Sequence, residues 1–357
     1  FSIIASNFYG NPSRKLKIIG ITGTNGKTST TFFIKEILNS LGVKCGIIGT
    51  IKNGWEADET EANLTTPEPM ELHRLLSQMV ESGCEYCVME VSSQALTQKR
   101  VYGINFSASA ITNITPEHLD YHGCMDDYIK AKLELFRLSD FACVNMDDEN
   151  ISRNLQNIKC RTITYSAISD KADYTAKNVV CNDKGIKYEF VGLDCIERIQ
   201  SSLHGQFTVY NTLCAISVLL NLGFDIEKLS KAVEKLTSVK GRGEIVPVSK
   251  SFTVMIDYAH TPSSLESILT AVRSYAKGRI ICAWGVGGDR DATKRPIMGE
   301  ISGRLADFTV LMSDQVRTED PLKILKEILQ TLLDNKAEDV FKYQATSNTT
   351  NISGVVI

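Results

Sequence analysis

The sequence has no apolar run of membrane-spanning length, no strong excess of charge of one sign and no secretory signal at its start. Its 39 lysines and arginines nearly balance 42 aspartates and glutamates, which leaves a formal net charge of -3. A basic field draws proteins to nucleic acid, and a membrane-spanning helix needs about 20 apolar residues in a row. We therefore expect a protein without a nucleic-acid partner and without a membrane span.

Cysteine is present, but without the spacing of a disulfide framework. Ten cysteines are spread between Cys45 and Cys282 in a chain of 357 residues, which is typical of a reducing compartment, so we expect a cytoplasmic protein. Cys84 and Cys87 form the one Cys-x-x-Cys pair. This pair runs from a helix end into an apolar strand with no second pair nearby, which favours buried structural thiols over zinc or redox chemistry.

The periodicity of apolar residues predicts an α/β protein with two domains, because helices and strands alternate in two separate stretches. In the first stretch we expect strands at 17–22, 44–50, 86–91 and 107–111 and helices at 28–41 and 71–81. Residues 160–203 form short segments in which apolar and polar residues alternate, with a turn at 182–185. This pattern predicts a small antiparallel appendage.

The second stretch predicts a Rossmann-like domain with a parallel sheet. We expect strands at 252–257, 279–284 and 308–312 and helices at 263–276, 296–306 and 320–334. The helix that ends before Gly241 marks the joint, so the expected domains are residues 17–240 and 241–357. Residues 344–354 are polar and irregular, and no internal repeat is present.

Residues 20–30 read Gly-Ile-Thr-Gly-Thr-Asn-Gly-Lys-Thr-Ser-Thr, a glycine-rich turn between a strand and a helix. Such a turn binds the phosphates of ATP: glycines let backbone N–H groups approach, the helix N-terminus offers its positive end, a lysine neutralises the outer phosphates and a hydroxyl binds Mg²⁺. The expected ATP-binding residues are Gly23, Thr24, Asn25, Gly26, Lys27 and Thr28. The common pattern would place a glycine at Ile21, so this is a shorter variant.

Polar residues also follow the other strands of the first stretch, where ligands gather in parallel sheets. Glu90 ends one strand and is a candidate Mg²⁺ ligand beside Thr28. The loop 112–123 carries His118, His122 and Asp120, for which we weigh metal and substrate contacts against helix capping. Lys132, by its local pattern alone, is a solvated helix residue.

Several further segments lie in a fixed order with this turn. They are Asn63-Leu64-Thr65-Thr66-Pro67, Met89-Glu90-Val91-Ser92-Ser93, His118-Leu119-Asp120-Tyr121-His122-Gly123, Asp257-Tyr258-Ala259-His260-Thr261-Pro262 and Gly287-Gly288-Asp289-Arg290-Asp291. The ordered set resembles the Mur ligases, ATP-dependent amino-acid ligases of peptidoglycan synthesis. The Asp-Tyr-His-Gly element is most similar to the MurE type, which extends UDP-N-acetylmuramoyl-L-alanyl-D-glutamate by a third residue.

The resemblance implies roles for individual residues. Lys132 would be carbamylated and would join Glu90 and His118 around a second Mg²⁺, with Thr28 on the first. Lys27, Lys132, His118 and Glu90 would form the catalytic group. Asn211, Arg242, Asp257 and His260 would contact ATP, and Thr65, Thr66, Ser92, Arg100, Asp314 and Arg317 would contact the substrates. For the hydroxyl residues, helix capping is the plain alternative; for Arg100 it is a surface charge.

The implied reaction has two small-molecule partners besides ATP: the UDP-muramoyl-dipeptide and an amino acid. ATP would phosphorylate the D-glutamate side carboxylate, and the amine of the amino acid would attack the resulting acyl phosphate. Members that add meso-diaminopimelate usually carry Asp-Asn-Pro-Arg where this chain has Asp314-Gln315-Val316-Arg317. The retained arginine favours diaminopimelate over lysine, because a guanidinium can bind its distal carboxylate.

The ends of the sequence depart from the family pattern. The segment 8–13 resembles the junction after the family's N-terminal uridine-nucleotide-binding domain, so we expect residues 1–16 to be a remnant or linker. The family's Gly-Lys-Gly-His-Glu motif is not found, so we expect an incomplete C-terminal domain. We also expect a monomer.

Other functions remain open from the residues alone. Folylpolyglutamate synthases and the ligase half of cyanophycin synthetase share the phosphate-binding turn, although the Asp-Tyr-His-Gly and Thr-Thr-Pro elements argue against them. A Mur-like protein that binds ATP without catalysis is a further alternative. A dinucleotide-binding oxidoreductase is disfavoured, because Arg290 stands where the third glycine of its motif belongs.

Overall fold

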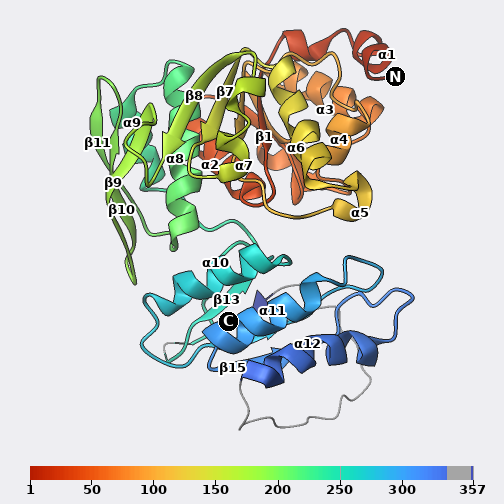
Figure 1. Cartoon of the computed structure of the whole chain (residues 1–357). Helices are drawn as coiled ribbons and strands as arrows, with labels where there is room; N and C mark the ends of the chain where they lie inside the picture. Colours follow the sequence, from red (N-terminus) through yellow and green to blue (C-terminus); the bar gives the residue numbers. More distant parts are fainter. Residues whose placement is uncertain (250, 336–354, 357) are drawn as a thin grey trace. The chain divides into compact units, whose positions relative to one another are not determined.

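The computed structural model describes residues 1–249, 251–335 and 355–356, so the polar segment 344–354 lies outside the described residues. The chain divides into two compact units (Figure 1): unit 1 comprises residues 1–180 and 185–237, and unit 2 comprises residues 181–184 and 238–357. The division expected at residues 240 and 241 stays a prediction. Among the described residues no helix has the length and apolar character needed to cross a membrane.

Unit 1 is built on an eleven-stranded sheet with the order β11-β10-β9-β8-β7-β6-β1-β5-β2-β3-β4. The strands are β1 (Lys17–Thr22), β2 (Cys45–Ile48), β3 (Lys52–Gly54), β4 (Thr60–Glu61), β5 (Tyr86–Glu90), β6 (Ala108–Ile111), β7 (Phe141–Asn145), β8 (Arg161–Ser166), β9 (Tyr174–Asn182), β10 (Gly185–Val191) and β11 (Ile196–Ser201). The strands from β2 through β5, β1, β6 and β7 to β8 pair in parallel. The expected parallel sheet is confirmed.

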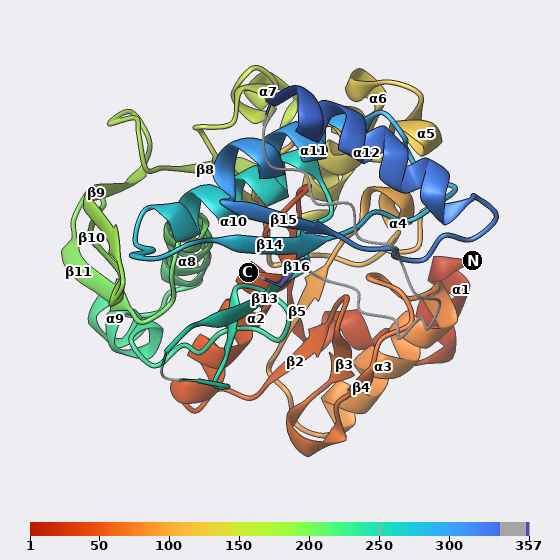
Figure 2. The same ribbon diagram turned by 90° about the horizontal axis from the view of Figure 1, so that it is seen from below.

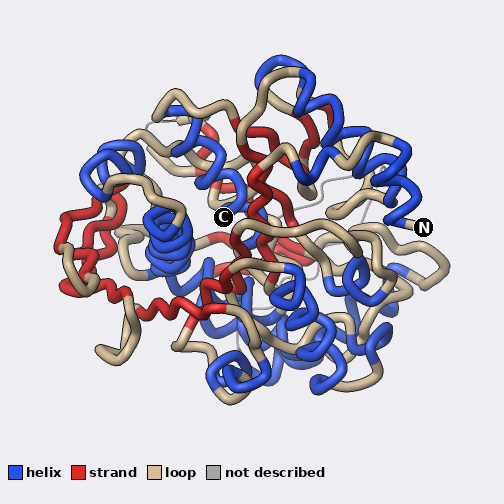
Figure 3. The backbone as a smooth tube through the Cα atoms, turned by 90° about the horizontal axis from the view of Figure 1, so that it is seen from above, coloured by secondary structure: helices blue, strands red, loops and turns tan. Residues whose placement is uncertain are grey.

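Helices cover both faces of this sheet. They are α1 (Ser2–Phe8), α2 (Lys27–Ser40), α3 (Pro69–Glu81), α4 (Ser93–Thr97), α5 (Leu119–His122), α6 (Met125–Leu133), α7 (Glu149–Ser152), α8 (Gln206–Asn221) and α9 (Ile226–Val233), with 3-10 turns at Pro12–Arg14, Glu56–Asp58, Glu134–Leu138 and Leu155–Asn157. Figure 1 shows α2, α8 and α9 on one side and α3, α4 and α6 on the other. Figure 3, coloured by secondary structure, shows the alternation of helices and strands.

The core explains why these segments form. Every residue of β1 after Lys17 is buried, as expected for a central strand between two helix layers. The helix predicted over 71–81 buries an apolar stripe against this strand: Leu72, Leu76 and Met79 belong to one core cluster with Ile18. Cys84 and Cys87 are buried in the same cluster, which confirms the interpretation of that pair as structural thiols.

The order of the strands reverses at β1. Strands β5 and β2 lie on one side of β1, whereas β6, β7 and β8 lie on its other side. Since neighbouring parallel strands end at the same edge, the register places Glu90 beside Ile21 and Ile111 beside Thr22. The loops after β1, β5 and β6 therefore meet at a topological switch point, where ligands bind in doubly wound sheets.

The antiparallel appendage is present but belongs to the same sheet. Strands β10 and β11 pair antiparallel, and Asp183 and Lys184 form the turn between β9 and β10. However, β8 pairs parallel with β7, and β9 pairs parallel with β8. The segment 160–203 therefore extends the central sheet instead of standing apart from it. Alternation along one strand cannot reveal which neighbour it pairs with.

Unit 2 has a five-stranded sheet in the order β12-β13-β16-β14-β15. The strands are β12 (Glu244–Val246), β13 (Val254–Asp257), β14 (Ile281–Trp284), β15 (Phe308–Leu311) and β16 (Val355–Val356), and the helices are α10 (Pro262–Arg273), α11 (Lys294–Leu305) and α12 (Pro321–Asn335). Figure 2 shows the three helices along one face of this sheet. The Rossmann-like alternation is confirmed, with element ends within three residues of those expected.

The expectation of an entirely parallel second sheet is wrong. Strands β14 and β15 are parallel, but β12 pairs antiparallel with β13, and β16 pairs antiparallel with both β13 and β14. Strands of two or three residues carry no readable periodicity, so only pairing with neighbours identifies them.

Replacement of Ile18 by alanine should lower the free energy of unfolding by about 2–5 kcal/mol, because the side chain is fully buried between helix layers and leaves a cavity. Urea unfolding followed by circular dichroism measures the change. The control is Ile168→Ala, since Ile168 is 74% exposed and its loss should cost less than about 0.5 kcal/mol. Equal losses in the two variants would contradict the assignment of the core.

Candidate active site

The phosphate-binding turn joins β1 to α2 and takes up a conformation that requires glycine at two positions. Gly23 has φ +136° and Gly26 has φ +84°, both in the region that L side chains rarely adopt. A Cβ on Gly23 would lie 1.9 Å from Thr112 Oγ1, and one on Gly26 would lie 2.6 Å from Asn211 Oδ1. The glycines therefore allow both the turn and its close approach to neighbouring segments.

The loop after β6 holds the turn in place. Thr24 N donates to Asn113 O at 2.8 Å, and Asn25 N donates to Asn113 Oδ1 at 2.9 Å. In return, Thr112 Oγ1 and Asn113 Nδ2 donate to Asn25 O at 2.6 and 3.0 Å. From the sequence, the loop 112–123 is a candidate for metal or substrate contacts, but no role was predicted for Thr112 or Asn113. Their position directly after a strand adjacent to β1 was the available signal.

Two polar side chains lie at the start of α2. Lys27 Nζ donates to the carbonyl oxygens of Gly23 and Thr24, each at 2.9 Å, so it folds back over the turn. Thr28 Oγ1 donates to Glu90 Oε2 at 3.0 Å. The structure thus brings together Thr28, from the start of α2, and Glu90, from the end of β5, as expected from the sequence.

Glu90 is fully buried at the end of β5 and is nevertheless well provided with donors. Besides Thr28, Thr50 donates to it twice, from its backbone N at 2.8 Å and from Oγ1 at 3.0 Å. These hydrogen bonds satisfy the oxygens of a buried carboxyl group, which would be costly to leave without partners. Sequence reasoning missed Thr50, because nothing local distinguishes a threonine after β2.

Lys132 is not a solvated residue, as its local pattern indicated, but is 2% exposed on α6. Its Nζ donates to Gly23 O at 2.8 Å and lies 4.6 Å from the centre of the Tyr128 ring. Burial lowers the pKa of the Lys132 amine well below its usual value, and the nearby charge of Lys27 lowers it further. The resemblance identified this residue where the sequence pattern could not, because burial comes from packing of α6.

His118 lies half-buried just before α5, with a left-handed backbone at φ 56°. Its ring is 6.4 Å from that of Tyr128, the residue one helical turn before Lys132. No side chain caps α5, so the capping alternative for this loop finds no support in α5. His118 and Lys132 therefore both lie near the ring of Tyr128.

The residues expected to contact the dipeptide substrate form a connected group. Thr66 Oγ1 donates to Glu90 O at 2.9 Å and accepts from Ser92 N at 3.0 Å. Thr65 Oγ1 lies 3.1 Å from Thr50 Oγ1. Arg100 Nη1 donates to Thr66 O at 2.8 Å, and its side chain is 13% exposed, so it is not a surface charge. Ser92 also caps α4 by accepting from Ala95 N.

The residues expected to contact ATP are divided between the units. Asn211 lies in unit 1 on α8, buried against Gly26, and accepts from Thr30 Oγ1 at 3.3 Å. In unit 2, Asp257 accepts from Gly243 N at 2.7 Å, and burial raises the pKa of its carboxyl group. The Arg242 guanidinium lies 4.6 Å from the Tyr258 ring centre, and His260 Nδ1 lies 3.0 Å from Tyr258 O.

Asp314 and Arg317 lie in the loop after β15, and Arg317 is exposed with φ 51°. Arg317 Nη1 donates to Gly288 O at 2.7 Å, which ties this loop to the one after β14. The structure thereby brings Arg317 beside the Gly287-Gly288-Asp289 motif, whose partner the sequence did not reveal.

The oxygen atoms of the side chains near the turn are suitable ligands for Mg²⁺. Among the described residues no group of three or more His, Cys, Asp or Glu side chains could hold a metal, so the fit rests on hydroxyl and carboxylate oxygens. Thr28 and Glu90 supply such oxygens, the hard ligands that Mg²⁺ prefers. The amine of Lys132 lies beside the same turn, and burial lowers its pKa well below its usual value.

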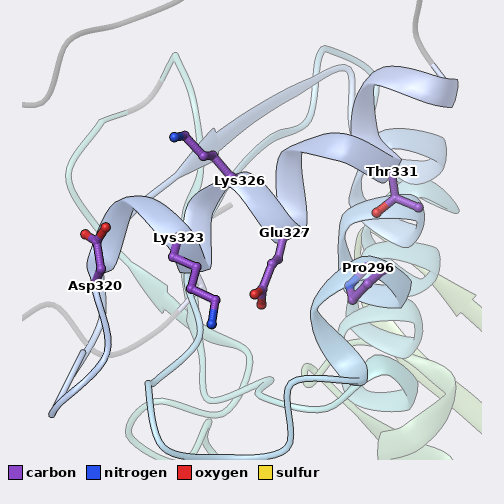
Figure 4. Close-up of a pocket in the computed structure, with 6 residues that line it drawn as sticks. All are labelled: Pro296, Asp320, Lys323, Lys326, Glu327 and Thr331. Carbon is purple, nitrogen blue, oxygen red and sulfur yellow. The ribbon is translucent and has the colours of Figure 1, made fainter.

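A groove of about 570 Å³ lies elsewhere, between α11 and α12 (Figure 4), and contains none of the expected site residues. It is lined by Pro296, Asp320, Lys323, Lys326, Glu327 and Thr331. Figure 4 shows Lys323 and Glu327 projecting from the same side of α12. This groove belongs to unit 2, whereas the candidate phosphate and metal ligands of unit 1 lie around the turn after β1.

The geometry of unit 1 defines a phosphate-binding loop at the carboxyl edge of a parallel sheet, with an acidic ligand from the neighbouring strand. Family models match most of the chain: the Mur ligase middle domain matches residues 21–219, and the Mur ligase, glutamate ligase domain matches residues 241–350. The chain belongs to the Mur ligase family. Ligases of this family are ATP-dependent and use Mg²⁺.

Within the family, the chain is similar in sequence to diaminopimelate ligases. The chain is 43% identical over 350 residues to UDP-N-acetylmuramoyl-L-alanyl-D-glutamate--2,6-diaminopimelate ligase 1 of Clostridium acetobutylicum, covering 96% of this chain and 72% of that protein. A solved structure of a diaminopimelate ligase of the same name matches with a TM-score of 0.69 at 29% identity, covering 92% of this chain and 70% of that one.

The Mycobacterium tuberculosis folylpolyglutamate synthase complexed with ADP matches with a TM-score of 0.73 at 17% identity, covering 93% of this chain and 82% of that one. At this identity the likeness concerns the fold alone. The folylpolyglutamate alternative therefore gains nothing from it, whereas the sequence similarity is with the diaminopimelate ligases.

Replacement of Gly23 by alanine should weaken ATP binding by about tenfold or more, because the new Cβ would collide with Thr112 Oγ1 at 1.9 Å. Isothermal titration with Mg²⁺-ATP measures the change. Gly42→Ala is the matched control: Gly42 also has positive φ, +78°, but nothing lies within 4 Å of its added Cβ. Weakening of the same size in both variants would show that backbone strain, not the approach of Thr112, decides binding.

Proposed function

We propose that this protein is the ATP-dependent ligase that adds meso-diaminopimelate, in preference to L-lysine, to UDP-N-acetylmuramoyl-L-alanyl-D-glutamate. The observation that carries the proposal is the site around Gly23, where Lys27, Thr28, Glu90 and Lys132 converge, in a chain 43% identical to a ligase of that name. The enzyme acts on small molecules in the cytoplasm, as a monomer, in building peptidoglycan precursors.

The reaction begins with transfer of the γ-phosphoryl group of ATP to the D-glutamate side carboxylate, which leaves ADP and an acyl phosphate. The N-terminal end of α2 and the Lys27 ammonium bind the phosphates, because they lie at the positive end of the helix dipole. The amine of diaminopimelate then attacks the acyl carbon, and phosphate leaves as the amide forms. Most of the rate comes from positioning and charge stabilisation.

Two Mg²⁺ ions fit the oxygens near the turn. Thr28 would hold one, and Glu90, His118 and carbamylated Lys132 would hold the other. Bound Mg²⁺ would neutralise the charge that develops on the transferring phosphoryl group. The depressed pKa of Lys132 supports carbamylation, since only a neutral amine attacks CO₂.

The remaining contacts follow from residue chemistry. Thr65, Thr66, Ser92 and Arg100 would bind the UDP-muramoyl-dipeptide, since their hydrogen-bonded group adjoins Glu90. Asn211, Asp257 and His260 would contact adenine and ribose, and Arg242 the phosphates. Asp314 and Arg317 would bind the distal amine and carboxylate of diaminopimelate.

Phosphate release from ATP tests the proposal. Release should require both UDP-muramoyl-dipeptide and an amino acid, and diaminopimelate should stimulate it more than lysine, because lysine offers no distal carboxylate to Arg317. Mass spectrometry of the product identifies the amide. Binding of Mg²⁺-ATP without stimulation by either amino acid would instead favour the non-catalytic or other-acceptor alternatives.

Replacement of Lys132 by alanine should lower kcat by about 100-fold or more, since it removes a metal ligand. Lys130→Ala is the control, because Lys130 lies on the same helix with its side chain 75% exposed. Wild-type activity should also fall in CO₂-depleted buffer, and should fall as the pH drops through the lowered pKa of Lys132, where protonation prevents carbamylation. A CO₂-independent wild-type rate would contradict the carbamate.

A further inference from the structure

Two loops at the carboxyl edge of the second sheet are joined to each other. Gly288 N donates to Gln315 O at 2.9 Å, and Arg317 Nη1 donates back to Gly288 O at 2.7 Å. A Cβ on Gly288 would lie 2.0 Å from Val316 O, so only glycine permits this approach. The loop after β14 therefore supports the loop that carries Asp314 and Arg317.

The joined loops contain backbone conformations that need outside support. Asp289 has φ 50° and Arg317 has φ 51°, although neither residue is glycine. Such left-handed residues persist where surrounding contacts hold them. The Asp289 carboxylate provides one contact, accepting from Thr318 N at 3.0 Å and from Thr318 Oγ1 at 2.7 Å.

A buried arginine of α11 provides the other contact. Arg295 is 1% exposed, and its guanidinium binds both oxygens of Glu319: Nη2 donates to Oε1 at 2.7 Å and Nη1 to Oε2 at 3.0 Å. Glu319 Oε1 also accepts from Asp289 N at 2.6 Å. One carboxylate thus links the helix, the loop after β14 and the loop after β15.

The charge on Glu319 is stable over the range of ordinary assays. The Arg295 guanidinium and the Asp289 N–H lower the pKa of Glu319 to about 2. Bidentate pairing between a guanidinium and a carboxylate has a fixed geometry, whereas an ammonium group would offer a single point charge. The link therefore fixes the orientation of Glu319 as well as its distance.

Glu327 offers a natural comparison. It accepts from Arg295 Nη1 at 2.6 Å, but it lies on α12 and lines the groove of Figure 4. Among the described residues the Glu327 side chain hydrogen-bonds to Arg295 and not to either loop. Glu319 and Glu327 thus share a partner and differ in whether they reach the loops.

We propose that Arg295 is a positioning residue for recognition of the incoming amino acid: through Glu319 it holds the two loops so that Arg317 and Asp314 face the distal group of diaminopimelate in one arrangement. This inference rests on the proposed ligase function. Arg295 itself contacts no substrate. Its loss leaves the phosphate-binding turn unchanged, because the residues of that turn lie in β1, α2 and the loop between them.

The test compares Arg295→Lys, Glu319→Gln and Glu327→Gln in the phosphate-release assay. Arg295→Lys and Glu319→Gln should raise KM for diaminopimelate by about tenfold or more and reduce the preference over lysine, while kcat and KM for ATP stay within about twofold. Glu327→Gln should leave all of these values near wild type. Hydrogen exchange of segments 285–291 and 314–319 should rise in the first two variants only.

The outcomes separate the two proposals. An equal rise in KM for Glu327→Gln would show that the pair merely stabilises unit 2 and would overturn the positioning role. An unchanged KM in Arg295→Lys and Glu319→Gln would overturn it as well. Absence of amino-acid-dependent release in the wild type would overturn the ligase function itself, and unchanged exchange of both segments would refute the hold of Arg295 on the loops.

Discussion

The carbonyl oxygen of Gly23 is the point on which the site of unit 1 depends. Lys27 Nζ and Lys132 Nζ both donate to it, at 2.9 and 2.8 Å, from two different helices. Two ammonium charges so close in a buried setting repel each other, and burial penalises each of them. Burial lowers the pKa of the Lys132 amine well below its usual value, and the nearby charge of Lys27 lowers it further. The two amines therefore meet at one backbone oxygen of the turn between β1 and α2.

The glycine conformation makes this convergence possible. Only a residue without a Cβ allows the turn to approach Thr112, and the loop after β6 then holds the backbone of Thr24 and Asn25. The carboxylate of Glu90 reaches Thr28 because β5 and β1 are in parallel register. The phosphate, metal and dipeptide contacts that we propose in unit 1 consequently share one edge of the sheet.

In unit 2, too, loops at the strand ends approach each other at a glycine, but an ion pair holds them. Loops after β14 and β15 meet at the strand ends, a glycine permits the closest approach, and an ion pair between buried Arg295 and partly exposed Glu319 supports the residues with left-handed backbone. In both units a helix supplies a buried side chain that donates hydrogen bonds to a segment at the strand ends: α6 supplies Lys132 and α11 supplies Arg295. Both side chains are buried, so their energetic effect depends on the packing of the helix that carries them.

The amino-acid sequence by itself determined the phosphate-binding turn, the central strands and helices, and the buried stripe of α3, because turn chemistry and apolar periodicity act over a few neighbouring residues. It also placed Glu90 at a strand end. Only the tertiary structure decided that Thr50, Thr112, Asn113 and Arg295 support the sites, that Lys132 is buried, and that β9 to β11 extend the central sheet. These features depend on strand pairing and helix packing between residues distant in sequence, and no local pattern encodes such pairings.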